Sequence, residues 1–263
     1  MPYRDIPAPH DAATRRNTTA WIEWANDEDL FPSVTPIPEG ACEVCFGAVG
    51  PLSQGGWWPT CLHCRGYRGI LTGVVPVAYS LQDGLESLLH RYKDWEPHDQ
   101  YRWMAFPLAS VLRVFLQQHL VCIEQRYGAV GLATIVPGNE VARGFSPLRR
   151  VIERFNQWPV TWEPDALEKV RSGRPGRGVV EPSYYALAEG QNVQDMTVLV
   201  LDDTWTSGST VASAAAVLRQ AGAAAVVALT IGRQLHPGWG SSDELIAAAE
   251  TRKFDPDRCV LCA

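Results

Sequence analysis

Two adjacent carboxylates followed by a hydroxyl-rich loop are the residues of this chain best suited to chemistry. Asp202 and Asp203 come directly after an apolar run at residues 198–201. The loop that follows is rich in hydroxyls and small side chains: Thr206, Ser207, Gly208, Ser209 and Thr210. Carboxylates accept hydrogen bonds from sugar hydroxyls, and hydroxyls with backbone N–H groups at the start of a helix bind phosphate. The order of these groups therefore predicts a sugar-phosphate site.

The elements that position this motif are predicted from the same stretch. Four consecutive apolar residues at 198–201 are typical of a strand covered on both faces of a parallel sheet, which puts the two acids at its carboxyl end. Ligands of open α/β sheets bind beyond the carboxyl ends of the strands. A helix is expected from about Ser209, with Gly222 as the residue after its end. In the alternative interpretation, the segment is only a buried strand with a capped helix, and the acids are turn residues.

A second candidate site consists of four cysteines. Cys42, Cys45, Cys61 and Cys64 form two Cys-x-x-Cys pairs separated by fifteen residues, which is the ligand spacing of a zinc ribbon. Four thiolates close the coordination shell, so we expect a structural Zn2+ and no metal catalysis there. The alternative is two disulfides, which need an oxidising compartment. The first twenty residues have no apolar stretch of signal-peptide length, so we expect a cytoplasmic protein and favour zinc.

The other three cysteines are less informative. Cys122 lies in an apolar helical run and is expected to be a core thiol. Cys259 and Cys262 form a third Cys-x-x-Cys near the end of the sequence. A frayed terminus is the default there, and the alternative is that the pair binds a second metal together with His236.

Composition narrows the classes of function. The 263 residues are 46% hydrophobic and 20% charged, as in ordinary soluble globular proteins. No segment reaches the roughly 18 apolar residues of a membrane span, so no span is expected. A net charge of -6 provides no overall basic field for nucleic acid. A local basic cluster would contact pyrophosphate or form a solvated face, and it consists of Arg143, Arg149, Arg150, Arg154, Lys169, Arg171, Arg174 and Arg177.

The chain divides into four parts. Residues 1–40 are polar and Pro-rich with a short helix around Trp21, residues 41–68 form the ribbon, residues 69–235 form the main domain, and residues 236–263 form a C-terminal tail.

The main domain is expected to alternate strands and helices. Strands are predicted at 74–79, 133–138, 198–201 and 225–231, and helices at 81–95, 103–126, 147–155 and 209–221. This alternation predicts an α/β fold with a mostly parallel sheet. The segment 171–182 is basic and interrupted by Gly and Pro, and it is expected to be a mobile flap.

The motif at 198–210 resembles the phosphoribosyl pyrophosphate (PRPP) signature of type I phosphoribosyltransferases: four apolar residues, two acids and a Thr/Ser/Gly-rich loop. A zinc ribbon followed by such a domain is similar to the ComF-type (competence protein F) family, whose bacterial members are associated with DNA uptake. The similarity covers about residues 41–233. Tyr79 and the segments 92–95 and 135–148 also resemble the family's pattern.

The resemblance implies a role for each part of the motif. Asp202 and Asp203 would bind the ribose hydroxyls of PRPP, and residues 206–210 would bind its 5'-phosphate. Mg2+ would neutralise the pyrophosphate leaving group. The residues implied for pyrophosphate binding are Pro137, Gly138 and Arg143, in a loop that is shorter than usual for the family and has a single Arg.

The flap and the acceptor side follow from the same resemblance. Residues implied to close over the site are Arg171, Arg174 and Arg177. Thr204 and Trp205 would form a wall for the acceptor, although Trp205 is equally suited to core packing. Thr206 stands where purine-salvage members carry an Asp that can act as a base, so purine salvage is disfavoured.

Two functional classes are consistent with the sequence. In the first, the protein is a phosphoribosyltransferase, a glycosyltransferase that passes the phosphoribosyl group to an unidentified nitrogenous acceptor. In the second, it binds PRPP or a nucleoside 5'-monophosphate without catalysis and acts in DNA uptake (competence) through single-stranded DNA or protein partners. The complete acid pair favours an enzyme, whereas the short pyrophosphate loop favours the second class. The oligomeric state is not predicted.

Overall fold

A four-stranded parallel sheet forms the centre of the protein. The structure, a computed structural model, describes residues 3–11, 17–34, 39–94, 99–138 and 145–262. The strand order is β1-β6-β5-β2, and every neighbouring pair is parallel. The strands are β1 (Gly73–Ser80), β6 (Ala225–Gln234), β5 (Thr197–Trp205) and β2 (Val130–Ile135). The predicted α/β fold with a mostly parallel sheet is confirmed.

Strand β5 is longer than its apolar run. It continues past Leu201 because β6 extends beside it, with Asp202 opposite Thr230 and Thr204 opposite Gly232. Asp202 and Asp203 therefore lie within the last part of the strand and not after its end, which corrects the sequence-based boundary. Backbone pairing on this side fixes the two carboxylates on a rigid element.

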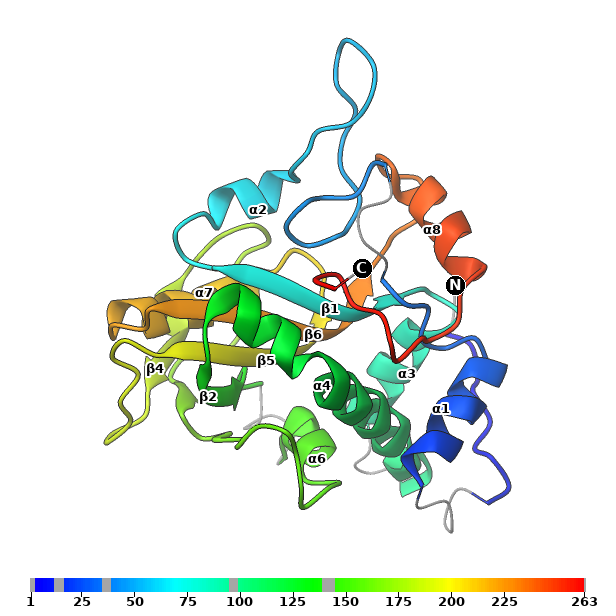
Figure 1. Cartoon of the computed structure of the whole chain (residues 1–263), viewed down its shortest axis with the longest axis horizontal. Helices are drawn as coiled ribbons and strands as arrows, with labels where there is room; N and C mark the ends of the chain where they lie inside the picture. The colour runs from blue at the N-terminus through cyan, green and yellow to red at the C-terminus, as the bar shows by residue number, and fades with distance from the viewer. Residues whose placement is uncertain (1–2, 12–16, 35–38, 95–98, 139–144, 263) are drawn as a thin grey trace.

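The two faces of the sheet are covered by different elements. Side chains alternate along a strand, so Leu199 and Leu201 pack on one face while Val198 and Val200 pack on the other. The helices that share the first core are α1 (Thr18–Asp27), α3 (Leu85–Arg91), α4 (Ala105–Tyr127) and α6 (Pro147–Ile152). The second core contains α7 (Ser209–Gln220) and the four N-terminal cysteines. In Figure 1 the segment that carries α2 (Leu62–Gly66) stands above the sheet.

Helix α1 is the short N-terminal helix that the sequence predicts. The Asn17 side chain caps it by accepting a hydrogen bond from the Thr19 N–H at 2.9 Å. Trp21 is 1% exposed and stacks on Phe106 with ring centroids 5.9 Å apart. Trp24 meets Trp103 edge to face at 5.3 Å. Aromatic packing of this kind explains how a helix in a polar segment is held on α4.

Helix α4 is more apolar than expected. The segment Tyr101–Tyr127 is long enough to cross a membrane and contains an 18-residue window with a mean hydropathy of 1.4, which is apolar enough to do so, whereas no such segment was predicted. Within that window 56% of the residues are buried inside the protein. Leu108, Leu112 and Phe115 lie in the core between α1 and the sheet, so the segment has the burial of a core helix.

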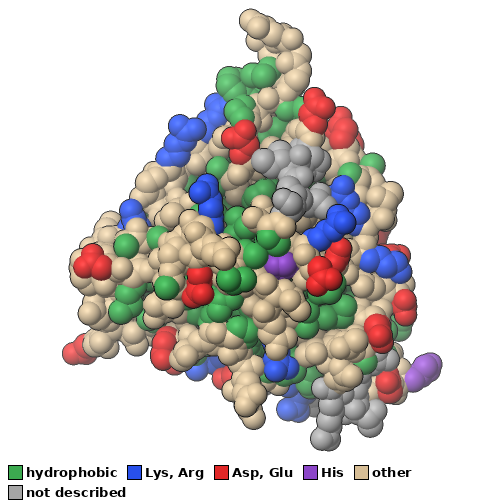
Figure 2. Space-filling model, viewed as in Figure 1, with side chains coloured by type: hydrophobic (Ala, Val, Ile, Leu, Met, Phe, Trp, Pro, Cys, Tyr) green, Lys and Arg blue, Asp and Glu red, His purple; other side chains and the backbone are tan. Residues whose placement is uncertain are grey.

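Smaller elements complete the fold. The 3-10 helices are η1 (Tyr92–Asp94), η2 (Asp99–Met104) and η3 (Pro182–Tyr184), and the last α-helix is α8 (Ser242–Glu250). Strands β3 (Leu167–Lys169) and β4 (Tyr185–Leu187) form an antiparallel pair that sequence analysis missed, because each is only three residues long. On the face drawn in Figure 2, acidic and basic side chains of the described residues are interspersed.

Candidate functional site

A cleft with a volume of about 350 Å³ lies at the carboxyl ends of β2 and β5. Parallel strands end at one edge of their sheet, so segments far apart in sequence meet there. The predicted site residues that line it are Pro137, Gly138, Arg174, Asp202, Asp203, Thr204, Thr206 and Thr210. Other lining residues, for which no role in this cleft was predicted, include Tyr92, Lys93, Tyr185, Gln234 and His236.

Asp203 is held by two residues of η1. Its side chain forms a salt bridge with Lys93, with Nζ 2.7 Å from Oδ2, and the Tyr92 hydroxyl donates a short hydrogen bond to the same oxygen. Burial alone would raise the pKa of Asp203, but the charge of Lys93 and these hydrogen bonds outweigh it and lower the pKa. Asp203 is therefore an ionised and fixed carboxylate at neutral pH.

Asp202 has the opposite electrostatic environment. It is half-buried and accepts a hydrogen bond from the Asp203 N–H at 2.9 Å. Burial, and then the negative charge of Asp203, raise the pKa of Asp202 to about 7. Two adjacent acids of the same strand thus differ in protonation, and Asp202 is the one whose negative charge a cationic or hydrogen-bonding ligand would stabilise.

The loop between β5 and α7 places Thr206 and Thr210 at the cleft. Gly208 precedes α7 with a positive φ of 80°, and a Cβ atom there would lie 2.3 Å from the Trp205 ring, so only glycine fits. α7 has twelve residues, and its first N–H groups have no partner within the helix. The start of α7 therefore offers N–H groups that could bind an anion beside the two acids.

Two hydroxyls of the loop are directed into the protein. Ser207 and Ser209 are buried, and their Oγ atoms are 2.9 Å apart. Ser209 Oγ also accepts a hydrogen bond from the Gly178 N–H at 2.7 Å and lies 3.3 Å from the Tyr67 hydroxyl. In this structure these serines shape the loop, whereas Thr206 and Thr210 face the cleft.

Trp205 is a core residue. Its side chain is 1% exposed and meets Tyr67 edge to face with centroids 6.3 Å apart. It does not line the cleft, so the structure supports core packing over an acceptor wall. Thr204, the other residue of that prediction, does line the cleft.

The three arginines of the predicted flap have different surroundings. The segment belongs to the connection between β3 and β4, and only Arg174 of the three lines the cleft. Arg171 lies over the Tyr184 ring at 4.8 Å. Burial, and then the charge of Arg177, lower the pKa of His63. The Glu181 N–H donates to Ser213 Oγ of α7 at 2.9 Å, which fixes the end of this segment against the helix.

The four N-terminal cysteines, Cys42, Cys45, Cys61 and Cys64, meet in one buried group that we call the four-cysteine cluster. All are at most 6% exposed, and their sulfurs lie within 4.8 Å of one another. The Cys45 and Cys61 sulfurs are 3.9 Å apart, and two sulfurs on a tetrahedral zinc lie about 3.8 Å apart. The Cys61 and Cys64 N–H groups donate to sulfurs at 3.3 and 3.5 Å. This cluster could hold a metal ion, and all seven cysteines of the protein are free.

Arg233 joins the four-cysteine cluster to the loop between β5 and α7, a link that sequence analysis missed. It is 6% exposed and donates to the Cys45 carbonyl at 2.9 Å and to the Trp205 carbonyl at 3.1 Å. Its Nη2 is 3.4 Å from Cys45 Sγ. Hydrogen bonds from neighbouring thiols, Cys42 first, and the charge of Arg233 lower the pKa of Cys45. No sequence signal marks Arg233, because its partners are far away along the chain.

The C-terminal cysteine pair lies beside different partners from those expected. The side chains near Cys259 and Cys262 are His119 and Cys122 of α4, and the four form a second group that could hold a metal ion. His236 instead lines the cleft. Pairing with His236 is therefore wrong, and Cys122 is more than an isolated core thiol. Arg143 falls outside the described residues.

Comparisons with known proteins are sparse. No protein-family model and no curated protein matches the chain. Among solved structures, a hypoxanthine phosphoribosyltransferase from Staphylococcus aureus matches with 10% sequence identity and a TM-score of 0.30. The match covers 47% of this chain and 72% of that chain. Similarity at this level does not establish the function of this chain.

Proposed function

We propose that this protein binds PRPP or a nucleoside 5'-monophosphate in the cleft and transfers the phosphoribosyl group to a nitrogenous acceptor. The observation that carries the proposal is the joint placement of Asp202 and Asp203 with Thr206 and Thr210. Two carboxylates on a strand and a small-residue loop at a helix start are the groups that a ribose 5'-phosphate needs. We propose accordingly that the chain is of the ComF type.

The two acids have separate tasks in this proposal. Asp203, fixed by Lys93 and Tyr92, accepts a hydrogen bond from a ribose hydroxyl without changing its protonation. Asp202, whose pKa is about 7, becomes ionised as the ribose hydroxyls donate to it. Backbone N–H groups at the start of α7 and the Thr206 and Thr210 hydroxyls hold the phosphate.

Cations line the cleft from which pyrophosphate would leave. Lys93, Lys169 and Arg174 come from three separate segments and all line it, as do Pro137 and Gly138. In the transfer, the bond between ribose C1 and the pyrophosphate oxygen breaks while the acceptor nitrogen bonds to C1. Positive side chains stabilise the departing charge, and Mg2+ carried by pyrophosphate would add to this with few protein ligands. The carboxyls of Asp202 and Asp203 offset positive charge at the ribose ring.

In this proposal the four-cysteine cluster supports the loop between β5 and α7 that binds the phosphate. Zn2+ with four thiolates has a net charge of -2, which the buried Arg233 guanidinium partly offsets. The same guanidinium donates to the carbonyl of Trp205, and the Tyr67 hydroxyl donates to the carbonyl of Ser207 at 2.9 Å. Loss of zinc should therefore change the position of the loop at the cleft, because Arg233 and Tyr67 hydrogen-bond to that loop.

Calorimetry with PRPP and with nucleoside 5'-monophosphates tests the binding site. Changing both Asp202 and Asp203 to Asn removes charge-assisted hydrogen bonds worth about 1.5 to 3 kcal/mol each, so affinity should fall at least about tenfold. Asp83→Asn is the control, because Asp83 is exposed and does not line the cleft. Unchanged affinity in the double variant would place the ligand elsewhere.

Pyrophosphate release tests catalysis. Release from PRPP with Mg2+ should appear with one member of a panel of bases, amines and ammonia. Arg143→Ala should lower turnover far more than PRPP affinity, since an enzyme stabilises the leaving group most in the transition state. Tight PRPP binding without release for any acceptor, together with retention of single-stranded DNA that is lost when residues 41–68 are deleted, would instead support the non-catalytic DNA-uptake function.

A further inference from the structure

Four side chains of the type that ligates metals lie outside the cleft and apart from the four-cysteine cluster. His119 and Cys122 are three residues apart on α4, and Cys259 and Cys262 belong to the C-terminal segment. The ligand atoms of the four all lie within 4.8 Å of one another. Cys259 is buried and Cys262 is exposed, so the group lies at the edge of the core. We call it the HCCC cluster.

Distances in the HCCC cluster fit a tetrahedral site. His119 Nδ1 is 3.4 Å from the Cys262 sulfur and 3.8 Å from the Cys122 sulfur. With Zn–S near 2.3 Å and Zn–N near 2.05 Å, tetrahedral geometry puts a sulfur and a nitrogen about 3.6 Å apart. The Cys259 and Cys262 sulfurs are 3.2 Å apart, and a shift of about half an ångström in the exposed Cys262 side chain gives the separation of two zinc-bound sulfurs.

The second nitrogen of His119 has the partner that a metal-bound histidine needs. Nε2 is 2.9 Å from the Pro256 carbonyl oxygen. A carbonyl can only accept, so the proton is on Nε2 and the lone pair of Nδ1 is directed at the sulfurs. Metal-binding histidines commonly donate their other N–H to a backbone carbonyl in this way.

A backbone hydrogen bond to sulfur gives a further parallel with the four-cysteine cluster. The Leu261 N–H donates to Cys259 Sγ at 3.3 Å, as the Cys64 N–H does to Cys61 Sγ at 3.5 Å. Such bonds stabilise a thiolate. A disulfide between Cys259 and Cys262 would explain only two of the four groups and would leave Cys122 and His119 Nδ1 directed at it.

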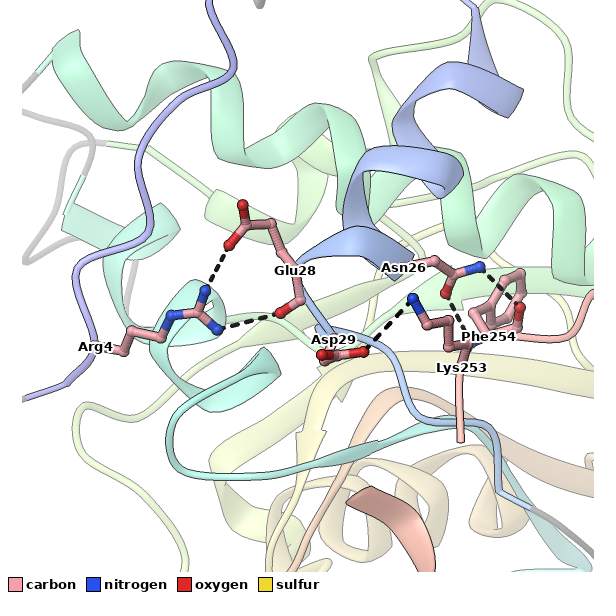
Figure 3. Close-up of polar contacts among 6 residues, drawn as sticks. All are labelled: Arg4, Asn26, Glu28, Asp29, Lys253 and Phe254. Carbon is pink, nitrogen blue, oxygen red and sulfur yellow. Dashed lines mark hydrogen bonds and ion pairs between the residues drawn. The ribbon is translucent and has the colours of Figure 1, made fainter. Parts of the chain in front are cut away.

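The residues that precede Cys259, the first C-terminal cysteine of the HCCC cluster, are already fixed to the protein. Phe254 is 4% exposed and exchanges two hydrogen bonds with Asn26 of α1, at 2.8 and 3.1 Å (Figure 3). Lys253 Nζ lies 3.9 Å from Asp29 Oδ1, an ion pair that Figure 3 also draws. The Asp255 N–H donates to Ser33 Oγ at 2.9 Å. The segment therefore arrives at α4 in a defined position, so little chain entropy remains to be lost when its cysteines bind a metal.

We propose that His119, Cys122, Cys259 and Cys262 form a second structural zinc site that fastens the C-terminal segment to α4. Three thiolates and one neutral imidazole complete four-coordination, so no position is left for catalysis. α1 packs on the same helix. The site thus ties the C-terminal segment to the helix on which α1 packs, on the sheet face opposite the four-cysteine cluster.

Metal analysis of the full chain, after dialysis against a chelator of moderate affinity, tests the proposal. Two zinc ions per chain are expected. Cys262→Ser should retain one, and it should fold because the side chain is exposed. Cys262→His should retain two, since it restores a zinc ligand. The control His10→Ala replaces an exposed histidine outside both cysteine groups and should also retain two.

X-ray absorption at the zinc edge assigns the ion. The parent should show an average of about 3.5 sulfurs and 0.5 nitrogens per zinc, and Cys262→Ser should show four sulfurs. Trypsin should cleave after the exposed Arg258 about tenfold faster in Cys262→Ser, because the segment is released from α4. One zinc with a pure sulfur shell in the parent, or a Cys259–Cys262 disulfide in the protein as purified under reducing conditions, would overturn the proposal.

Discussion

Replacing Asp202 by Asn should stabilise the protein, and by more at higher pH. The pKa of Asp202 is raised to about 7 by burial and the charge of Asp203, against about 3.9 for an unfolded Asp. The folded state therefore keeps this proton to higher pH than the unfolded state does. Stability from this group is fully present below about pH 4 and is lost as the pH rises through 7. Asn is neutral and still accepts the hydrogen bond of the Asp203 N–H.

The size of the effect follows from the two pKa values. Linkage gives a penalty from the ionised Asp202 of about 1 to 2 kcal/mol at pH 5 and about 4 kcal/mol at pH 8. The difference in free energy of unfolding between Asp202→Asn and the parent should therefore grow by about 2 to 3 kcal/mol between these pH values. Asp203 stays ionised over this pH range in both proteins because its pKa is lowered, and titrating groups distant from Asp202 cancel in this difference.

Urea unfolding of both proteins at several pH values measures the effect. Asp203→Asn is the matched control with the opposite sign, because it leaves Lys93 facing a neutral amide and should cost about 1 to 3 kcal/mol at pH 8. A difference between Asp202→Asn and the parent that stays constant from pH 5 to pH 8 would refute the assignment of the raised pKa to Asp202.

Three further variants probe the connection between the four-cysteine cluster and the loop. Gly47→Ala should destabilise the protein by about 1 to 3 kcal/mol in urea unfolding, because the new Cβ would lie 1.7 Å from Arg233 Nη2; Gly66→Ala, with nothing within 4 Å, should be nearly neutral. Trp205→Ala should cost about 3 to 5 kcal/mol as a core cavity, whereas an acceptor wall would lose turnover without losing stability. Cys61→Ser should release one zinc and weaken PRPP binding measured by calorimetry, with the circular dichroism of the α/β core retained; full zinc content in this variant would contradict the assignment of zinc to the four-cysteine cluster.

Local patterns determined much of what sequence analysis predicted. An apolar run, two acids, a small-residue loop and a helix are contiguous at 198–220, so their order along the chain is also their order in space. The start of the helix predicted from residue 147 is local in the same way, because Ser146 caps it and Pro147 occupies its first position. The Cys-x-x-Cys pairs are equally local, because a tight turn brings two sulfurs together whatever the rest of the fold does.

Only the tertiary structure decided the partners of these motifs. Tyr92 reaches Asp203 across 111 residues, Arg233 reaches Cys45 across 188, and His119 reaches Cys262 across 143. Such contacts depend on which helix covers which face of the sheet, and no short sequence pattern encodes that. The unequal pKa values of Asp202 and Asp203 have the same origin, since the two acids are identical in type and adjacent in sequence. Burial raises the pKa of both, so their difference comes from the contacts of Lys93 and Tyr92 with Asp203, which only folding makes, and from the charge of Asp203 next to Asp202.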